Sequence, residues 1–111
     1  MLYHYLNAYF QGTLKGGCRE GPGVIIDSHN NFISSHFSYD SLNGPTFICL
    51  YGNLFIFGEF RDGKMDGINT IDSVDFKCVG RYQRGNMVGK GLVIDKKSKT
   101  VYVIEYCEQN I

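Results

Sequence analysis

Residues 58–72, GEFRDGKMDGINTID, and residues 80–95, GRYQRGNMVGKGLVID, decide the fold that the sequence predicts. Each stretch opens with a glycine, carries an aromatic residue two positions later and a second glycine five positions later, and ends in Ile-Asp. A similar stretch opens at Gly12, and a more divergent one opens at Ser35. The four openings are 23, 23 and 22 residues apart. Recurrence at a fixed period of this length is typical of a repeat protein.

Bulky residues and glycines recur in phase across these copies. Two positions after each opening stand Leu14, Phe37, Phe60 and Tyr82, and Tyr106 continues the series. Glycine supplies a positive φ in a turn, and elsewhere it lets a neighbouring backbone or ring approach closely. We therefore expect a structural role for the glycines that keep the phase, namely Gly12, Gly21, Gly44, Gly58, Gly63, Gly67, Gly80, Gly85 and Gly89.

Each copy predicts a β-hairpin. A short stretch with a bulky inward residue leads to a polar turn with glycine, and then to an apolar run such as Val24-Ile25-Ile26 or Leu92-Val93-Ile94. Polar segments such as 27–31 and 95–99 link one hairpin to the next. Because a lone hairpin is unstable in water, the copies must stack. The predicted fold is all-β: an elongated single antiparallel sheet of stacked hairpins, whose nine or ten strands span roughly 40–48 Å.

The chain is expected to form one domain over residues 1–111, since its length suits a single core. An uncovered sheet end favours end-to-end pairing, so a homodimer stays open as an alternative. The predicted parts are an N-terminal cap at 1–9, repeats at about 10–32, 33–55, 56–77 and 78–100, and a C-terminal cap at 101–111.

The tandem pattern Y-x-G-x-[WFY]-x-x-G-x-x-x-G-x-G resembles the MORN (membrane occupation and recognition nexus) repeat family over about residues 10–106. The leading tyrosine of that motif is replaced here by Phe10, Ile33, Ile56 and Cys78. The resemblance implies stacked hairpins with a concave face that grips an extended or helical peptide. The aromatic row is expected to lie mostly in the core, with part of it binding a protein partner; its members are Phe37, Phe60, Tyr82 and Tyr106.

Gly58-x4-Gly63-Lys64 comes within one residue of a phosphate-binding loop, which continues with a serine or threonine and leads into a helix. Here Met65 follows the lysine, and the residues beyond it continue a hairpin. We therefore expect no nucleotide site and no cofactor. Asp62 and Asp66 are interpreted as solvated turn residues rather than as a cation site, because Lys64 stands where a calcium loop needs an oxygen ligand.

The cysteines and histidines predict neither a metal site nor a catalytic one. Cys18, Cys49, Cys78 and Cys107 lie about thirty residues apart without a C-x2-C pair, so zinc is not expected. Free thiols are favoured, and disulfides stay open. The three histidines, His4, His29 and His36, share no nucleophile motif with a serine or cysteine, so we expect no enzyme.

Charge is balanced overall but unevenly distributed. A formal net charge of zero gives no support to nucleic-acid binding. Residues 1–75 carry four bases against eight acids, whereas residues 76–99 carry seven bases against Asp95 alone. These bases either protect a solvated edge repeat or form a patch for anionic lipid heads or an acidic partner. They are Lys77, Arg81, Arg84, Lys90, Lys96, Lys97 and Lys99.

Three absences favour an intracellular protein, either cytoplasmic or associated with cytoskeleton or membrane. No apolar run approaches the roughly 20 residues of a membrane span, no basic residue precedes the first apolar stretch, and no N-x-[ST] sequon occurs. The leading interpretation is a non-catalytic scaffold or adaptor that binds a protein partner within a larger assembly. The alternatives are a membrane-associating module that uses the basic fourth repeat and an accessory piece of an enzyme.

Overall fold

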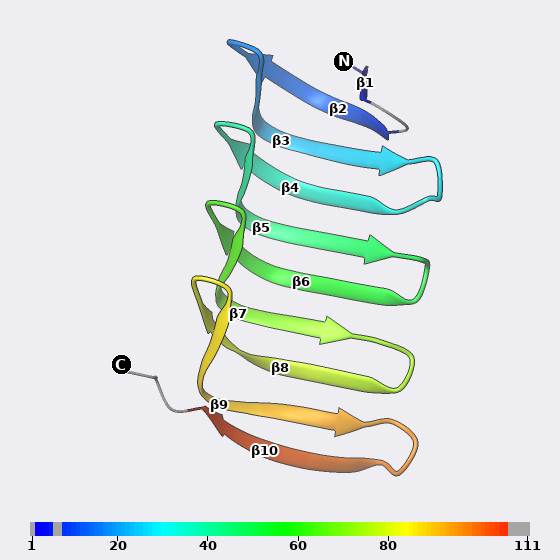
Figure 1. Cartoon of the computed structure of the whole chain (residues 1–111), viewed down its shortest axis with the longest axis vertical. Helices are drawn as coiled ribbons and strands as arrows, with labels where there is room; N and C mark the ends of the chain where they lie inside the picture. Colours follow the sequence, from blue (N-terminus) through cyan, green and yellow to red (C-terminus); the bar gives the residue numbers. More distant parts are fainter. Residues whose placement is uncertain (1, 6–7, 107–111) are drawn as a thin grey trace.

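The computed structural model describes residues 2–5 and 8–106 of the chain. These residues form one antiparallel sheet in which ten strands follow each other in sequence order, with no helix (Figure 1). The predicted all-β fold of stacked hairpins is confirmed, and the long axis measures 44 Å. The strands are β1 (Leu2–Tyr5), β2 (Ala8–Lys15), β3 (Cys18–Asp27), β4 (Phe32–Ser38), β5 (Ser41–Leu50), β6 (Leu54–Arg61), β7 (Lys64–Asp72), β8 (Phe76–Gln83), β9 (Asn86–Asp95) and β10 (Thr100–Tyr106).

Two-residue turns join the strands within each of the four hairpins from β2 to β9. Both central residues of every turn have a positive φ, as in Asp62 at 50° and Gly63 at 82°. This is the conformation of the type I′ turn, whose twist matches that of the strands it joins. The chain continues from Gly63 into β7 at Lys64 with no helix, so the glycine–lysine pair belongs to a hairpin, as the sequence predicts. The four turns are Gly16-Gly17, Tyr39-Asp40, Asp62-Gly63 and Arg84-Gly85.

Every hairpin bends partway along its length. In the third hairpin, Gly58 pairs with Asn69 and Phe60 pairs with Met65, so a short step on β6 faces a longer one on β7. An irregularity of this kind kinks the longer strand. The longer strand has a glycine with a positive φ within this irregular step. That glycine pairs with a residue on the first strand of the next hairpin, as Gly67 pairs with Tyr82. The bend folds the hairpin tip over one side of the sheet, which we call the inner face.

The inner face holds the core of the protein. Phe10, on the straight part of β2, is 0% exposed, and Phe37, on the next tip, is 1% exposed. Their rings meet edge to face with centroids 5.4 Å apart, and the Arg19 guanidinium lies 5.0 Å from the Phe37 ring centre. Phe60 and Tyr82 are buried at the same phase of the later copies. The prediction that this row is mainly core is therefore confirmed for these three aromatic residues.

Two rows of directly paired residues cross the inner face from strand to strand. One row is apolar and half-buried, and it runs beside the buried aromatic residues: Ile25, Ile33, Ile48, Ile56, Ile71, Cys78 and Val93. The other row, nearer the bend, is made of small or polar residues: Gly23, Ser35, Thr46, Gly58, Asn69, Gly80 and Gly91. The small side chains of the second row leave room for the bulky side chains that pack against it. A methyl group built on Gly23 would lie 2.5 Å from the Phe10 ring.

Backbone hydrogen bonds join consecutive copies at the tips. In the last three turns, the second residue donates its N–H to a carbonyl of the preceding tip: Asp40 to Arg19 at 3.1 Å, Gly63 to Leu42 at 2.9 Å and Gly85 to Met65 at 2.8 Å. The opposite ends of the strands are also joined. There the Lys96 N–H donates to the Asp75 carbonyl at 2.8 Å, and the Tyr51 N–H donates to Asn31 Oδ1 at 2.5 Å.

Candidate functional site

The outer face of the sheet, opposite the folded tips, carries a broad exposed apolar surface. Strand alternation places Phe55 and Phe57 there, on either side of the inward Ile56. A soluble monomer rarely leaves a wide apolar patch open to water. The exposed large apolar residues of this face are Tyr9, Ile26, Phe47, Phe57, Ile68, Leu92, Val101 and Val103.

Four phenylalanines gather at the middle of the outer face. The Phe47 ring stacks on Phe32 at 5.5 Å and on Phe57 at 6.1 Å, and it lies 6.0 Å from Phe55. These rings come from three adjacent strands, β4, β5 and β6. Stacking fixes their positions relative to one another, so the centre of the face presents a preformed aromatic surface.

An apolar hollow of about 620 Å³ lies on the same face near the last strands. Its apolar lining comes from Ile68, Val79, Val88, Leu92 and Val103. Two cations, Arg81 and Lys90, stand at its side. An apolar floor beside a few charged groups is the usual make-up of a protein-binding surface, in which the floor provides affinity and the charges provide orientation.

The charges along the outer face are mainly acidic on the earlier strands and mainly basic on β8 and β9. Near the bends, Glu20, Glu59 and Asp66 lie on earlier strands, and Arg81 and Lys90 lie on β8 and β9. Glu59 and Asp66 border one shallow hollow, and Asp66 and Arg81 border the next. Glu20 has the same phase in its copy as Asp66 in the third. Two charges depart from this order: Arg61 borders the same hollow as Glu59 and Asp66, and Glu105 on β10 lies directly across from Lys90.

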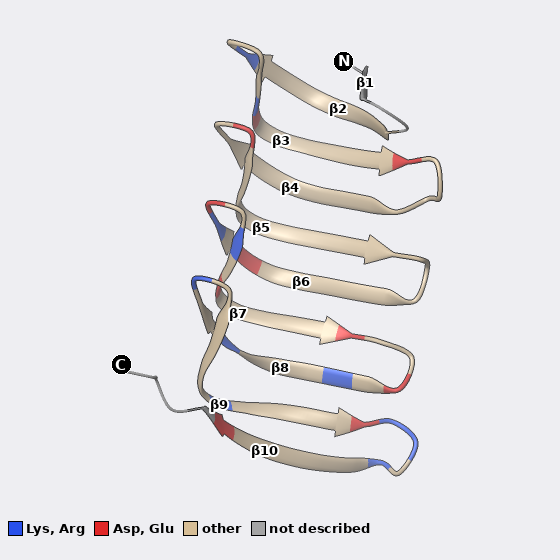
Figure 2. Cartoon of the chain, viewed as in Figure 1, with Lys and Arg blue, Asp and Glu red and all other residues tan. Residues whose placement is uncertain are grey.

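The seven bases predicted as one patch lie in two separate places. Lys96, Lys97 and Lys99 are in the turn between β9 and β10, and Arg84 is in the hairpin turn at the other end of the strands (Figure 2). The Lys96 ammonium pairs with Asp72 and also donates to the Ser73 carbonyl at 2.6 Å. Lys77 lies directly across from Asp72 on the neighbouring strand. Arg81, Arg84 and Lys90 lie toward the opposite end of the strands from this group.

The aromatic row predicted to bind a partner lies on the inner side. The side chains of Phe37, Phe60 and Tyr82 are buried under the tips, and that of Tyr106 is outside the described residues. A cluster of stacked, partly exposed aromatic side chains lies instead on the outer face, around Phe47. Phe76 and Tyr102 are also exposed, on the inner side beyond the tips. One feature of the sequence does indicate an apolar outer face. Runs such as Val24-Ile25-Ile26 and Phe55-Ile56-Phe57 are apolar at every position, which is typical of a strand covered on both faces.

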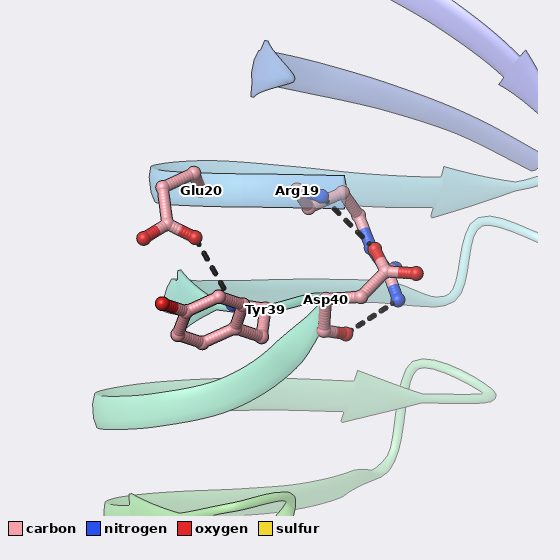
Figure 3. A network of polar contacts seen from close by, with 4 residues as sticks. All are labelled: Arg19, Glu20, Tyr39 and Asp40. Carbon is pink, nitrogen blue, oxygen red and sulfur yellow. Dashed lines mark hydrogen bonds and ion pairs between the residues drawn. The ribbon is translucent and has the colours of Figure 1, made fainter. Parts of the chain in front are cut away.

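A polar network surrounds the second hairpin turn (Figure 3). Asp40 Oδ1 accepts hydrogen bonds from the Arg19 backbone N–H at 3.0 Å and from Arg19 Nε at 2.5 Å. The Tyr39 N–H donates to Glu20 Oε2 at 3.0 Å. Hydrogen bonds from Arg19, first from its backbone and then from its side chain, lower the pKa of the Asp40 carboxyl.

The Asp40 network predicts a specific loss of stability in acid. Because the folded-state pKa lies below the unfolded value of about 3.9, the contribution of Asp40 is complete above that pH and is lost as the pH falls through the folded-state pKa. We expect thermal melts between about pH 5 and pH 2 to show a smaller fall in Tm for Asp40→Asn than for the natural chain. Asparagine suits the positive φ of 72° at this turn position. Arg19→Gln should flatten the profile in the same way; a profile parallel to that of the natural chain in both variants would contradict this assignment.

The remaining candidate chemistry is sparse in the part of the chain that the structure describes. Cys18, Cys49 and Cys78 are free thiols, and Cys107 lies outside it. Within it, no three His, Cys, Asp or Glu side chains come together as a metal site. No helix in this part is long and apolar enough to cross a membrane.

No family model matches the chain. No curated protein matches it by sequence.

Proposed function

We propose that this chain is a non-catalytic scaffold or adaptor module of the MORN type, which holds a protein partner on the outer face of its sheet within a larger assembly. One observation carries the proposal: an apolar face with a preformed aromatic centre and an adjoining hollow is open to water along the sheet. A sheet with an apolar face needs a second layer to cover it. Among the described residues, the hairpin tips cover part of the inner face, and no strand lies over the outer one.

A substitution on the outer face should remove partner binding and spare the fold. Leu92, 41% exposed beside the apolar hollow, is the first choice for replacement by lysine. A charge there would have to be buried without a partner group, which costs several kcal/mol. Val74→Lys is the matched control, since Val74 is 64% exposed in the connection between β7 and β8. Affinity purification from the native cell should recover partners with the natural chain and with Val74→Lys, and lose them with Leu92→Lys.

Circular dichroism and thermal melts of the three proteins check that each is folded. Equal recovery of the same proteins by Leu92→Lys and by the natural chain would place the binding surface elsewhere. If Leu92→Lys loses both its partners and its folded spectrum, Val103→Lys is tested instead. Val103 lines the same hollow and is more exposed, at 68%, so a lysine there is easier to accommodate.

The second candidate, binding to anionic lipid, is favoured by Lys96, Lys97 and Lys99 in a single turn. Surface bases of this kind contribute up to about 1 kcal/mol each at a membrane, and salt screens them. Vesicles containing phosphoinositide would then be bound at low salt and released as salt rises. Replacing the three lysines by glutamine would abolish that binding and leave the protein partners of the outer face in place.

A further inference from the structure

We propose that the partner on the outer face is a second copy of this chain, packed face to face with its long axis antiparallel to that of the first. The inference rests on the proposed function, because it names the occupant of the same surface. Two features support it: the size of the apolar face, and the change of charge sign along it.

The outer face has the area that a stable dimer needs. The sheet is 44 Å long, and the five or six residues of each strand between bend and turn span roughly 20 Å at ~3.4 Å per residue. Such a face approaches the ~800 Å² per partner of a standard protein interface. Two sheets packed at a spacing of ~10 Å form a β-sandwich, the ordinary way of covering an apolar sheet.

The charge distribution favours a second copy as the partner, with its long axis antiparallel to that of the first. Residues 1–75 carry four bases and eight acids, and residues 76–111 carry seven bases and three acids, so the two ends have opposite charge. Two chains side by side in the same direction would place like ends together. The antiparallel arrangement places the acidic end of each copy against the basic end of the other, and like-charge contacts are avoided.

A two-fold axis along the strand direction, between β5 and β6, satisfies both features. It brings β3 of one copy opposite β8 of the other, so Glu20 of each copy faces Arg81 of the other at the margin near the bends. The aromatic cluster around Phe47 lies at this axis and packs against its own counterpart, as an isologous interface requires. Arg81 forms no ion pair with a described residue of its own chain, whereas Lys90 lies directly across from Glu105 on β10.

The mass of the protein in solution tests the dimer. Sedimentation equilibrium at low salt should give twice the chain mass of 12.6 kDa, and Leu92→Lys should shift the protein to monomer while Val74→Lys stays dimeric. Arg81→Glu should raise the dimer Kd about tenfold by setting a like charge against Glu20. Glu20→Arg should do the same, and the double variant Glu20→Arg with Arg81→Glu should return the Kd toward that of the natural chain.

Cross-linking tests the direction of packing. Within one chain, β3 and β9 are six strands apart, or roughly 29 Å, so a zero-length carbodiimide cannot couple Glu20 to Lys90. Between antiparallel copies these residues come to the same end of the dimer. A mixture of light and ¹⁵N-labelled chains should yield the Glu20–Lys90 peptide pair with mixed labels, at a level that rises with dimer concentration.

Three results would overturn the second copy as occupant. They are a monomer at every concentration tested, a dimer that Leu92→Lys and the charge reversals leave unchanged, and links that join Lys90 only to acids of the same end. A monomer that still captures other proteins through Leu92 would leave the proposed function standing. A monomer that captures nothing would remove both.

Discussion

Phe37→Ala should lower the free energy of unfolding by about 3–5 kcal/mol, a large share of the ~5–15 kcal/mol that holds a domain of this size together. Phe37 is 1% exposed, meets the Phe10 ring edge to face and lies under the Arg19 guanidinium. The substitution therefore leaves a cavity between two hairpins and removes an aromatic contact and a cation–π contact together. Neighbouring copies would also lose the surface that keeps them stacked.

Urea unfolding followed by circular dichroism measures this effect. Phe57→Ala is the matched control, because it removes the same side chain from a position on the outer face that is 37% exposed. Its cost should be clearly smaller, since less surface is returned to water. Equal losses at the two positions would show that the core does not lie on the inner side of the bends.

Gly58→Ala should be the second large loss, for two separate reasons. Gly58 has a φ of +151°, where side chains are rarely accommodated, and its added methyl group would lie 2.3 Å from the Ile68 carbonyl oxygen and 2.5 Å from Asn69 Oδ1. The unfavourable φ alone costs about 1–3 kcal/mol. The contact with the carbonyl adds to that cost because backbone on a paired strand moves only by distorting the pairing between β6 and β7.

Gly63→Ala separates the two reasons. Gly63 also has a positive φ, at +82°, yet nothing lies within 4 Å of where its methyl group would be. Its variant should show the conformational cost alone, so its urea midpoint should fall between those of the natural chain and Gly58→Ala. If Gly63→Ala were as unstable as Gly58→Ala, the close approach of β7 to Gly58 would not be what requires glycine there.

The repeat period of the sequence is enough to predict most of this fold. Openings at Gly12, Ser35, Gly58 and Gly80 locate the hairpins, because glycine and bulky residues at fixed offsets mark turns and inward positions. The second copy has no glycine in its tip turn, yet Tyr39 and Asp40 adopt positive φ values of 47° and 72° there. That turn is stabilised by a hydrogen bond from the Arg19 N–H to Asp40 and by one from the Tyr39 N–H to Glu20.

The bend and the outer face are harder to read from sequence. A register shift such as the one between Gly58 and Phe60 depends on which residues pair across strands, and a list of apolar positions does not contain that information. The bend in turn decides which face is covered. The repeat phase correctly predicted that Phe37 and Phe60 point inward. It did not predict the exposed surface around Phe47, because the alternation of side chains does not show which side of a sheet is covered. The seven bases likewise share a segment of sequence but lie at both strand ends.

The bonds between successive tips have a consequence for how the chain reaches its native state. Because Asp40, Gly63 and Gly85 each reach back only to the preceding hairpin, these contacts join consecutive copies of the repeat rather than distant ones. Order can then nucleate at any adjacent pair of hairpins and propagate outward like a zipper, and it would fray from the two ends first. Hydrogen exchange should accordingly be slowest in β5 and β6 and fastest at the ends of the array.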